Sequence, residues 1–212
     1  MSGLGQKATV AVKRPLFTWG TKKRLLRLVA ENGRSDGNAG QATRSKAVPM
    51  NQRSSHGLSR QASNIVAATD MAVVRILFEE YSQGLGFSLC FQNFDQELAE
   101  LPGRYAPPRG GLWLAWAAGM PAGCVALRPL SGDTCEMKRL YVRPAHAGHG
   151  LGRALAEAAV AGARERGYAT IRLDTLESMT AANALYKKLG FRSIPPYCDN
   201  PLDGALYYEL SL

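Results

Sequence analysis

The amino-acid sequence predicts an α/β protein of the α+β type, with a mixed, mostly antiparallel central sheet of about seven strands and flanking helices. Residues 112–142 contain three strand-like runs separated by short turns, which is typical of an antiparallel meander. A helix, a strand and a second helix then follow, and this order adds one parallel strand pairing. The composition, 46% hydrophobic and 20% charged, fits a folded domain, and no apolar run is long enough for a membrane span. We therefore expect no membrane partner.

A basic segment, residues 1–60, differs from the rest of the chain. It holds 12 basic and 2 acidic residues, a net +10, whereas residues 61–212 hold 14 basic and 15 acidic residues, a net −1. Its polar, aperiodic stretches favour disorder. A short amphipathic piece at residues 21–31 leaves an organelle transit peptide open, and a start nearer Met50 is a further alternative. We place the domain in residues 61–212, expect a cytoplasmic protein unless the segment is a targeting signal, and confine any nucleic-acid binding to residues 1–60.

The first part of the domain predicts a strand, two helices and the meander. Residues 62–67 suit a short strand, and Thr69 or Asp70 can cap a helix in which Val73, Ile76 and Tyr81 recur at helical spacing. Residues 93–101 suit a second helix, stopped by a Pro-Gly pair. The meander strands are expected at residues 112–117, 124–130 and 134–142, with turns at 119–123 and 131–133.

The second part changes from strand to helical periodicity. Residues 150–166 predict a helix with Leu151, Leu155 and Ala159 on its buried side, ended by Gly167. The remaining elements are expected to be a strand at 168–174, a helix at 179–189, and strands at 191–194 and 205–210.

The four cysteines give no sign of a metal site. They stand at positions 90, 124, 135 and 198, without a C-x-x-C pair and without histidines at zinc-ligand spacing. We expect no metal and free thiols, because a domain of this length can build a core without disulfide bonds.

A glycine-rich loop, residues 142–153, leads from a strand into a helix. Gly148, Gly150 and Gly152 let a ligand approach the backbone closely, and the helix start offers unpaired N–H groups that suit a pyrophosphate. The G-x-G-x-G spacing after a meander differs from a Rossmann dinucleotide fingerprint, and no Gly-Lys-Ser/Thr follows as in a Walker loop. The loop therefore predicts a phosphate-bearing ligand of another class.

Two motifs in this order resemble those of the GNAT superfamily of N-acetyltransferases. The run Val-Arg-Pro-x3-Gly-x-Gly-Leu-Gly at residues 142–152 is similar to its acyl-CoA-binding motif, and Ala-Asn-Ala-Leu-Tyr-Lys-Lys-Leu-Gly-Phe at residues 182–191 to its second signature. The resemblance covers about residues 61–212. It implies the GNAT acyl-CoA acyltransferase fold, acetyl-CoA as co-substrate, and direct acetyl transfer to a primary amine of a small molecule or protein in a ternary complex.

The resemblance also implies which residues bind acetyl-CoA. Leu140, Tyr141 and Val142 would offer strand backbone to the pantetheine and the thioester, and Asn183 would contact the pantetheine arm. The pyrophosphate would be held by Ala147, Gly148, His149, Gly150, Leu151, Gly152 and Arg153. Positions 145 and 147, where the family usually has Gln or Arg, are both Ala, so two side-chain phosphate contacts are missing. His146, His149 and Arg153 are the candidates to replace them.

Catalysis requires a group that takes a proton from the amine and one that assists the leaving thiolate. Glu136 is the expected general base, because it stands where family members carry a catalytic glutamate. Strand alternation would put it on the face of Lys138, Leu140 and Val142, with Met137 and Tyr141 on the other face. An ion-paired glutamate, with proton removal through water, is the alternative.

The expected general acid is Tyr186, with a core aromatic as the alternative. Acidic and aromatic residues near the expected acceptor mouth are candidates for binding a cationic amine. These are Glu80, Tyr197 and Asp199.

A rival interpretation from another functional class is a non-catalytic CoA-binding protein whose basic arm binds nucleic acid or ribosomes. The alanines at positions 145 and 147 give it some support. The sequence leaves the acceptor and a possible homodimer open.

Overall fold

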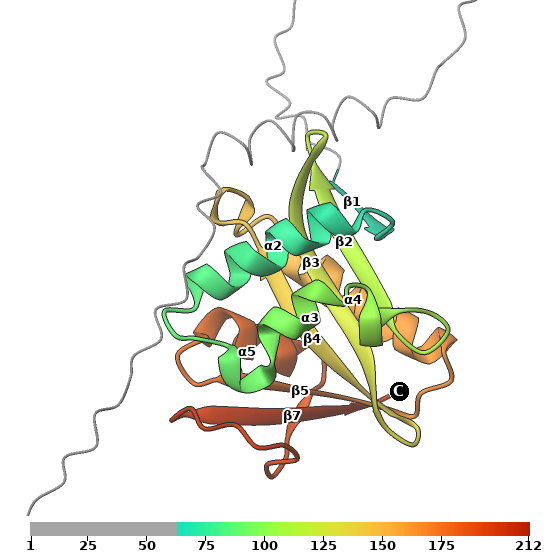
Figure 1. Ribbon diagram of the computed structural model, residues 1–212. Coiled ribbons are helices and arrows are strands. Elements are labelled where there is room, and N and C mark those ends of the chain that lie inside the picture. Colours follow the sequence, from blue (N-terminus) through green and yellow to red (C-terminus); the bar gives the residue numbers. More distant parts are fainter. Residues whose placement is uncertain (1–62) are drawn as a thin grey trace, which may run out of the picture. The chain divides into compact units, whose positions relative to one another are not determined.

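The computed structural model describes residues 63–212, so the predictions for the basic segment lie outside the described part. Within it, seven strands form one sheet in the order β1-β2-β3-β4-β5-β7-β6 (Figure 1). Every neighbouring pair is antiparallel except β4 and β5, which are parallel. The predicted mixed, mostly antiparallel sheet with one parallel pairing is therefore confirmed.

The elements follow the predicted order, with small shifts of their ends. The strands are β1 (Ser63–Ala67), β2 (Gly111–Ala117), β3 (Met120–Ser131), β4 (Thr134–Val142), β5 (Thr170–Leu176), β6 (Arg192–Ser193) and β7 (Ala205–Ser211). The helices are α2 (Met71–Gly84), α3 (Phe94–Ala99), α4 (Leu151–Glu165) and α5 (Thr180–Lys188), with short 3-10 turns η1 (Cys90–Gln92), η2 (Gly103–Tyr105) and η3 (Pro144–His146).

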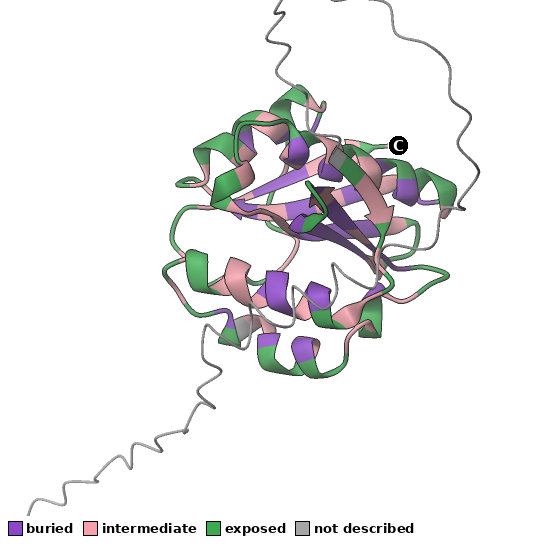
Figure 2. Ribbon diagram, turned by 90° about the horizontal axis from the view of Figure 1, so that it is seen from above, coloured by how far each residue is buried: buried purple, intermediate pink, exposed green. Residues whose placement is uncertain are grey.

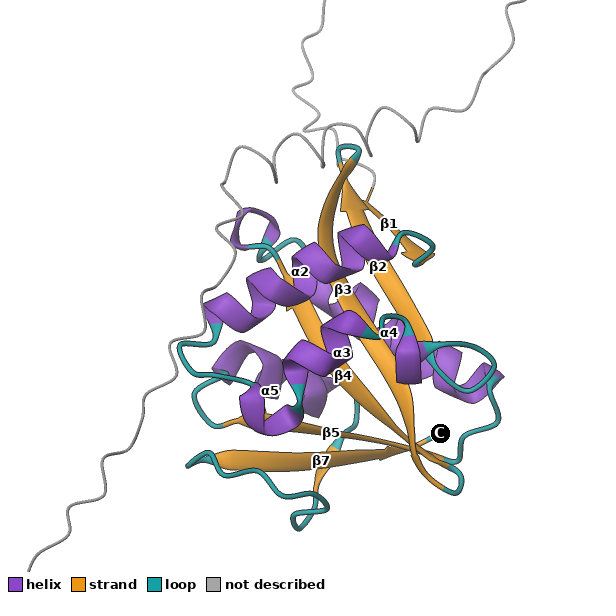
Figure 3. Ribbon diagram, viewed as in Figure 1, coloured by secondary structure: helices purple, strands orange, loops and turns teal. Residues whose placement is uncertain are grey.

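The helices cover both faces of the sheet. α2 and α3 lie on one face, and α4 and α5 on the other (Figures 2 and 3). Between the sheet and α4 lies the main core, in which Leu127, Leu155 and Ile171 are fully buried. Small residues on α4 permit close approach: a Cβ added at Gly162 would collide with the ring of Trp113 on β2. α4 thus lies close against the sheet, and its first turn is held next to the end of β4.

The start of α2 is capped as the sequence predicts. Asp70 is the N-cap residue, and its carboxylate accepts hydrogen bonds from the backbone N–H groups of Ala72 and Val73. Val73, Val74 and Leu77 form the buried face of the helix. This packing brings the C-terminal end of α2, with Tyr81, over β4, where the rings of Tyr81 and Tyr141 lie 6.1 Å apart.

The turn between β2 and β3 is shorter than predicted. The chain reverses at Ala118 and Gly119, whose φ angles of 50° and 75° are typical of a two-residue type I′ hairpin. β3 therefore begins at Met120 and includes Pro121, which the sequence analysis placed in a turn. The β2–β3 register shifts between Ala115 and Trp116, next to this turn.

A β-bulge in β4 overturns the expected side-chain alternation. The β3–β4 register shifts opposite Val125, and Arg139 has a φ of 57°. Met137, Leu140 and Val142 consequently belong to the core beneath α4, and Tyr141 turns toward α2. The prediction that Glu136 shares a face with Leu140 and Val142 is therefore wrong, because one extra residue reverses the alternation beyond the bulge.

β4 and β5 diverge soon after they begin to pair. Only Thr134, Cys135 and Glu136 pair with β5, at Thr170, Ile171 and Arg172. Beyond this point β5 continues to pair with β7, while the edge of β4 that faces β5 has no partner strand within the described sheet. The divergence leaves a strand edge with free backbone N–H and C=O groups, and the pocket of the molecule opens there.

Candidate functional site

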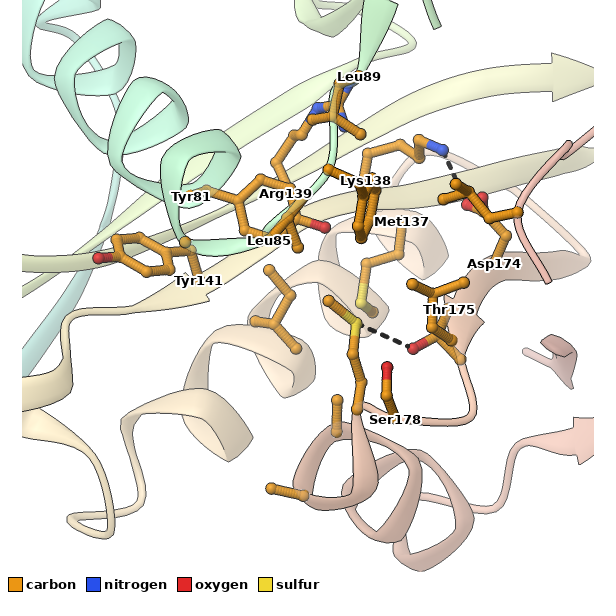
Figure 4. A pocket seen from close by; sticks show the side chains of 18 of the residues that line it. Tyr81, Leu85, Leu89, Met137, Lys138, Arg139, Tyr141, Asp174, Thr175 and Ser178 are labelled. Carbon is orange, nitrogen blue, oxygen red and sulfur yellow. Dashed lines mark hydrogen bonds and ion pairs between the residues drawn. The ribbon is translucent and has the colours of Figure 1, made fainter. Parts of the chain in front are cut away.

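A cavity of about 510 Å³ lies between the diverging strands. One side, which we call the backbone half, is formed by the free edge of β4 at Leu140, Tyr141 and Val142, the first residues of α5, and Tyr186. The other side, which we call the charged half, is formed by Tyr81, Gln92, Lys138, Arg139, Asp174 and Asn200 together with apolar residues. Figure 4 shows this pocket with Lys138 extending from β4 toward Asp174 on β5.

The loop after β4 is anchored by Arg143. Its backbone N–H donates to the carbonyl of Ala122 over 2.8 Å, and its Nη1 donates to the carbonyl of Pro121. Its Nε and Nη2 bind both carboxylate oxygens of Glu80 on α2, at 2.8 and 3.0 Å. Glu80, expected to contact the acceptor, does not line the pocket and holds the loop against α2 instead.

The glycine loop and the start of α4 fit an anionic group. Gly148 and Gly150 have φ angles of 78° and 81°, and a Cβ added at either would meet no atom within 4 Å. Gly150 is the N-cap of α4 and no side chain caps the helix, so the first-turn N–H groups stay available for an anion. Ala147, His149 and Arg153 are exposed, whereas the side chain of Leu151 is buried in the core and only its backbone faces the loop.

Asn183 joins the end of β5 to α5. Its Nδ2 donates to the carbonyls of Leu176 and Glu177, at 2.9 and 3.4 Å. Its Oδ1 is buried and is the one buried side-chain polar atom without a hydrogen-bond partner among residues 63–212. An unsatisfied buried acceptor is costly, so this oxygen suits a donor such as an amide N–H of an incoming ligand. Asn183 itself does not line the pocket, whereas its neighbour Ala182 does. The pantetheine arm of CoA carries amide N–H groups, and the free edge of β4 with this acceptor beside it fits CoA.

Glu136 lies behind the pocket wall. It is 1% exposed, accepts from Nε of Arg128 at 2.7 Å and from the hydroxyl of Tyr197 at 2.9 Å, and does not line the pocket. Nζ of Lys138 lies 3.7 Å from its Oε1. This geometry matches the alternative of an ion-paired glutamate rather than a base in direct contact with an amine.

An ion pair bridges the point where β4 and β5 separate. Nζ of Lys138 lies 2.8 Å from Oδ1 of Asp174, and Nδ2 of Asn200 donates to Oδ2 of Asp174 over 3.1 Å. Burial alone would raise the pKa of Asp174, but the charge and hydrogen bond of Lys138 outweigh it and hold that pKa below its ordinary value. Asp174 is therefore an ionised carboxylate at neutral pH, and it lines the charged half of the pocket.

Arg139, the residue of the bulge, is also paired. Its Nε and Nη2 bind the two oxygens of Glu97 on α3, at 2.9 and 2.6 Å, and its Nη1 donates to Oε1 of Gln92 over 3.0 Å. The hydroxyl of Tyr105 also donates to Glu97. Burial alone would raise the pKa of Glu97, but the hydrogen bonds and the charge of Arg139 lower it by more. The pKa of Glu97 therefore lies below its ordinary value.

Tyr186 lines the backbone half of the pocket, while its ring packs against Phe191 and Tyr208 at centroid distances of 5.8 and 6.3 Å. Burial raises the pKa of its phenol well above the ordinary value, with smaller contributions from the charges of Tyr81 and Asp174. Tyr186 is therefore a protonated hydrogen-bond donor over the whole neutral range. Tyr186 is thus packed as a core aromatic and also lines the pocket, and its role as general acid stays a prediction.

The loop between β6 and β7 reaches the pocket through other residues than those expected. Asn200 and Leu202 line it, whereas Tyr197 and Asp199 do not. Tyr197 instead packs against Tyr207 and binds Glu136.

Among residues 63–212, no group of His, Cys, Asp or Glu side chains is arranged to hold a metal ion. All four cysteines are free thiols. No helix in this part of the chain is long and apolar enough to cross a membrane.

Sequence reasoning missed most of the charged half. It named Tyr81 only for its helical spacing and Lys138 only as a neighbour of Glu136. It proposed no site role for Gln92, Arg139 or Asp174. One signal was available: Lys138 and Arg139 stand consecutively inside a strand that the meander places at the centre of the sheet. Buried cations in a central strand require partners, and their partners define this half of the pocket.

Comparisons with known proteins agree with this arrangement. The family model described as the acetyltransferase (GNAT) family matches residues 73–191. A protein of Schizosaccharomyces pombe named an uncharacterised N-acetyltransferase is 40% identical over 145 residues, which cover 68% of this chain and 89% of the relative. A GNAT-family acetyltransferase structure from Staphylococcus aureus is 19% identical with a TM-score of 0.61, and covers 71% of this chain and 99% of its own.

A further solved structure contains the expected ligand. It is a putative acetyltransferase from Salmonella typhimurium with its cofactor acetyl-CoA, 24% identical with a TM-score of 0.56, and it covers 71% of this chain and 94% of its own. The fold, the two motifs and these relatives agree: the chain belongs to the GNAT family and is an N-acetyltransferase.

Proposed function

We propose that the protein transfers the acetyl group of acetyl-CoA directly to a primary amine, with both substrates bound in the pocket between β4 and β5. The observation that carries this proposal is the free backbone edge of β4, which runs to the uncapped N-terminus of α4. A strand edge can bind the amides of the pantetheine arm, and a helix N-terminus can bind a pyrophosphate.

Acetyl-CoA supplies the activated thioester, and the residues of the backbone half bind and orient it. In our proposal Leu140, Tyr141 and Val142 hold the pantetheine arm through main-chain hydrogen bonds. The buried Oδ1 of Asn183 accepts a hydrogen bond from it. The pyrophosphate is held by the backbone of residues 147–153, so the alanines at positions 145 and 147 are compatible with binding.

Tyr186 is proposed to assist the departure of the CoA thiolate. A phenol with a raised pKa does not transfer its proton readily to a thiolate whose conjugate thiol has a pKa of about 8.5. It does donate a strong hydrogen bond to the negative charge that develops on sulfur. Tyr186 therefore acts as an electrostatic stabiliser of the leaving group rather than as a fully dissociating acid.

Glu136 is proposed to act indirectly, without contact to the amine. It is separated from the pocket and fully engaged with Arg128 and Tyr197, so proton removal from the amine passes through water in the pocket. Its function is then to position Lys138 from behind the wall. Glu136→Gln should lower kcat without shifting the pKa of the pH–rate profile, and a profile whose acidic limb disappears in the variant would instead establish Glu136 as the base.

The proposed function is tested by two measurements on the full chain. Isothermal titration with acetyl-CoA should show binding, and a broad amine and peptide panel should release CoA in an amine-dependent manner. Absence of binding at millimolar acetyl-CoA would overturn the proposal. Binding without CoA release from any amine would favour a non-catalytic CoA-binding protein.

A further inference from the structure

The lining of the charged half contains two cations and one carboxylate. Among the described residues that line the pocket, three are charged: Lys138, Arg139 and Asp174. Glu97 and Glu136, which also pair with the two cations, do not line it. The lining residues alone thus carry one positive charge in excess, and Glu97 and Glu136 behind them supply carboxylates that offset it.

The carboxylate of Asp174 is already occupied. Its Oδ1 is 2.8 Å from Nζ of Lys138 and its Oδ2 is 3.1 Å from Nδ2 of Asn200. A cation at that distance cancels most of the field that the carboxylate would exert on a second cation. A simple alkyl ammonium would therefore find no uncompensated carboxylate on the described lining, contrary to the sequence-based expectation of a site for cationic amines.

The cations, by contrast, keep hydrogen-bond donors without partners. Lys138 has three N–H groups; one donates to Asp174, and the carboxylate of Glu136 is 3.7 Å away, beyond hydrogen-bond distance. Arg139 has five N–H groups, of which three make hydrogen bonds within residues 63–212. Unused donors on a positively charged wall are best satisfied by an anionic oxygen ligand, and a carboxylate is the common one.

The position of these cations suits a carboxylate close to the reacting amine. Lys138 precedes Leu140, whose backbone faces the proposed thioester site, by two residues on β4. At a rise of about 3.3 Å per residue the two positions are separated by about 7 Å or less. An amine and a carboxylate joined by one to a few carbons span such a gap, and Leu85, Leu89 and Leu202 offer apolar contacts to the rest of the acceptor.

We propose that the acceptor is an amino acid, with a free carboxylate a few bonds from its amine, and that the unused N–H groups of Lys138 bind this carboxylate. Asp174 positions Lys138 for this contact across the gap between β4 and β5. The inference rests on the proposed acetyl transfer and names its substrate class.

Matched acceptors test it directly. CoA release is measured with the full chain for triplets that share one side chain: phenylalanine, phenylalaninamide and phenethylamine, and the corresponding leucine series. The kcat/KM of each acid should exceed those of its amide and its decarboxylated amine by about tenfold or more, because the latter offer no carboxylate to the unused N–H groups of Lys138. Equal or faster acetylation of the amides or amines overturns the inference and leaves the proposed function intact. Acetyl-CoA binding without turnover of any acid also overturns it, whereas no acetyl-CoA binding means that the proposed function itself has failed.

A pair of variants assigns the preference to residues. The double variant Lys138→Met with Asp174→Asn removes the ion pair without leaving a buried charge unpaired, and the acid-to-amide ratio should fall to about one or two. The ratio is internal to each preparation, so a partly unfolded sample does not alter it. Lys138→Arg should restore part of the preference, and Arg164→Met, which removes an exposed cation on α4, should leave the ratio unchanged. A preserved ratio in the double variant would contradict the assignment to Lys138.

Discussion

The two halves of the pocket are built from different chemical groups. The backbone half uses main-chain N–H and C=O groups of Leu140, Tyr141 and Val142, and the glycine loop that follows, outside the pocket lining, adds the N–H groups at the start of α4. The charged half uses side chains from α2, η1, β4, β5 and the loop at residues 200–202. A site made of backbone depends on chain conformation, whereas a site made of side chains depends on residue identity. The first can therefore serve a co-substrate common to a family, and the second can differ with the acceptor.

The charged half also holds the surrounding elements together. Arg139 with Glu97 joins β4 to α3, Lys138 with Asp174 joins β4 to β5, and Arg128 with Glu136 joins β3 to β4. Next to the backbone half, the Arg143–Glu80 pair joins the loop after β4 to α2 with side chains 16% and 26% exposed, and the Arg153–Glu157 pair of α4 is more than half exposed. Substitutions in the charged half should therefore change stability, and substitutions in the backbone half should change acetyl-CoA binding.

The largest effect is expected from Arg139→Met. The arginine side chain is 2% exposed and that of Glu97 is 12% exposed, so the variant leaves a buried carboxylate without its partner. Breaking a buried pair on one side costs about 3–5 kcal/mol. Urea unfolding should show a loss of this size, and a loss below about 1 kcal/mol would show that the charged half does not stabilise the fold.

The double variant Arg139→Met with Glu97→Gln is the matched control and should recover much of the loss, because no charge stays buried alone. It also gives a pH signature. The folded-state pKa of Glu97 is below its ordinary value, so the pair's stabilisation is complete above about pH 4.5 and is lost as pH falls through the lowered pKa. Unfolding curves from pH 7 to pH 3 should therefore decline more steeply for the wild type than for the double variant.

Gly150→Val should weaken acetyl-CoA binding and should leave the side chains of the charged half in place. Gly150 has a φ of 81°, which a β-branched residue adopts only with strain of about 1–3 kcal/mol, and relaxation of that strain would displace the N–H groups at the start of α4. The Kd for acetyl-CoA should rise about tenfold or more by isothermal titration. Gly167→Val is the control, because Gly167 has a φ of 73° after the other end of α4; it should lower stability and leave the Kd unchanged. Equal effects of the two variants on the Kd would show that the glycine loop does not bind acetyl-CoA.

Tyr186→Phe removes one hydroxyl at the backbone half. If that hydroxyl donates to the developing thiolate, kcat should fall about tenfold, equivalent to about 1.4 kcal/mol, with the KM for acetyl-CoA unchanged. Tyr208→Phe is the matched control, since Tyr208 packs against the ring of Tyr186 but does not line the pocket. Full activity of Tyr186→Phe would leave this tyrosine a packing role only.

The difference between the halves also explains what the sequence could predict. The order of elements, the sheet type and the glycine loop follow from local patterns: turn residues, helical spacing and positive-φ glycines within a few positions of each other. Tyr81, Asp174 and Asn200 come together only because separate elements meet at the gap between β4 and β5. Such long-range proximity leaves no periodic signal in a single sequence.

The bulge at Arg139 is the second reason why the sequence-based prediction of the site was incomplete. It reverses the alternation of β4, so it moves Leu140 and Val142 into the core and leaves Glu136 behind the pocket wall. No glycine or turn residue marks the position: Arg139 adopts a φ of 57° although it is not glycine, and its guanidinium is held by Glu97 and Gln92. The tertiary contacts of the charged half therefore accompany an irregularity that local propensity does not reveal.

The smallest effect is expected from Arg153→Ala, which tests whether any side chain supplements the backbone half. The guanidinium is 59% exposed and pairs with Glu157 one helical turn away, so its loss should change stability by less than about 0.5 kcal/mol. If Arg153 contacts a phosphate in place of the alanines at positions 145 and 147, the KM for acetyl-CoA should rise a few-fold and its dependence on salt should weaken. An unchanged KM at low and high salt would mean that acetyl-CoA binds without help from Arg153, and that the N–H groups of the loop and of α4 hold the pyrophosphate without this side chain.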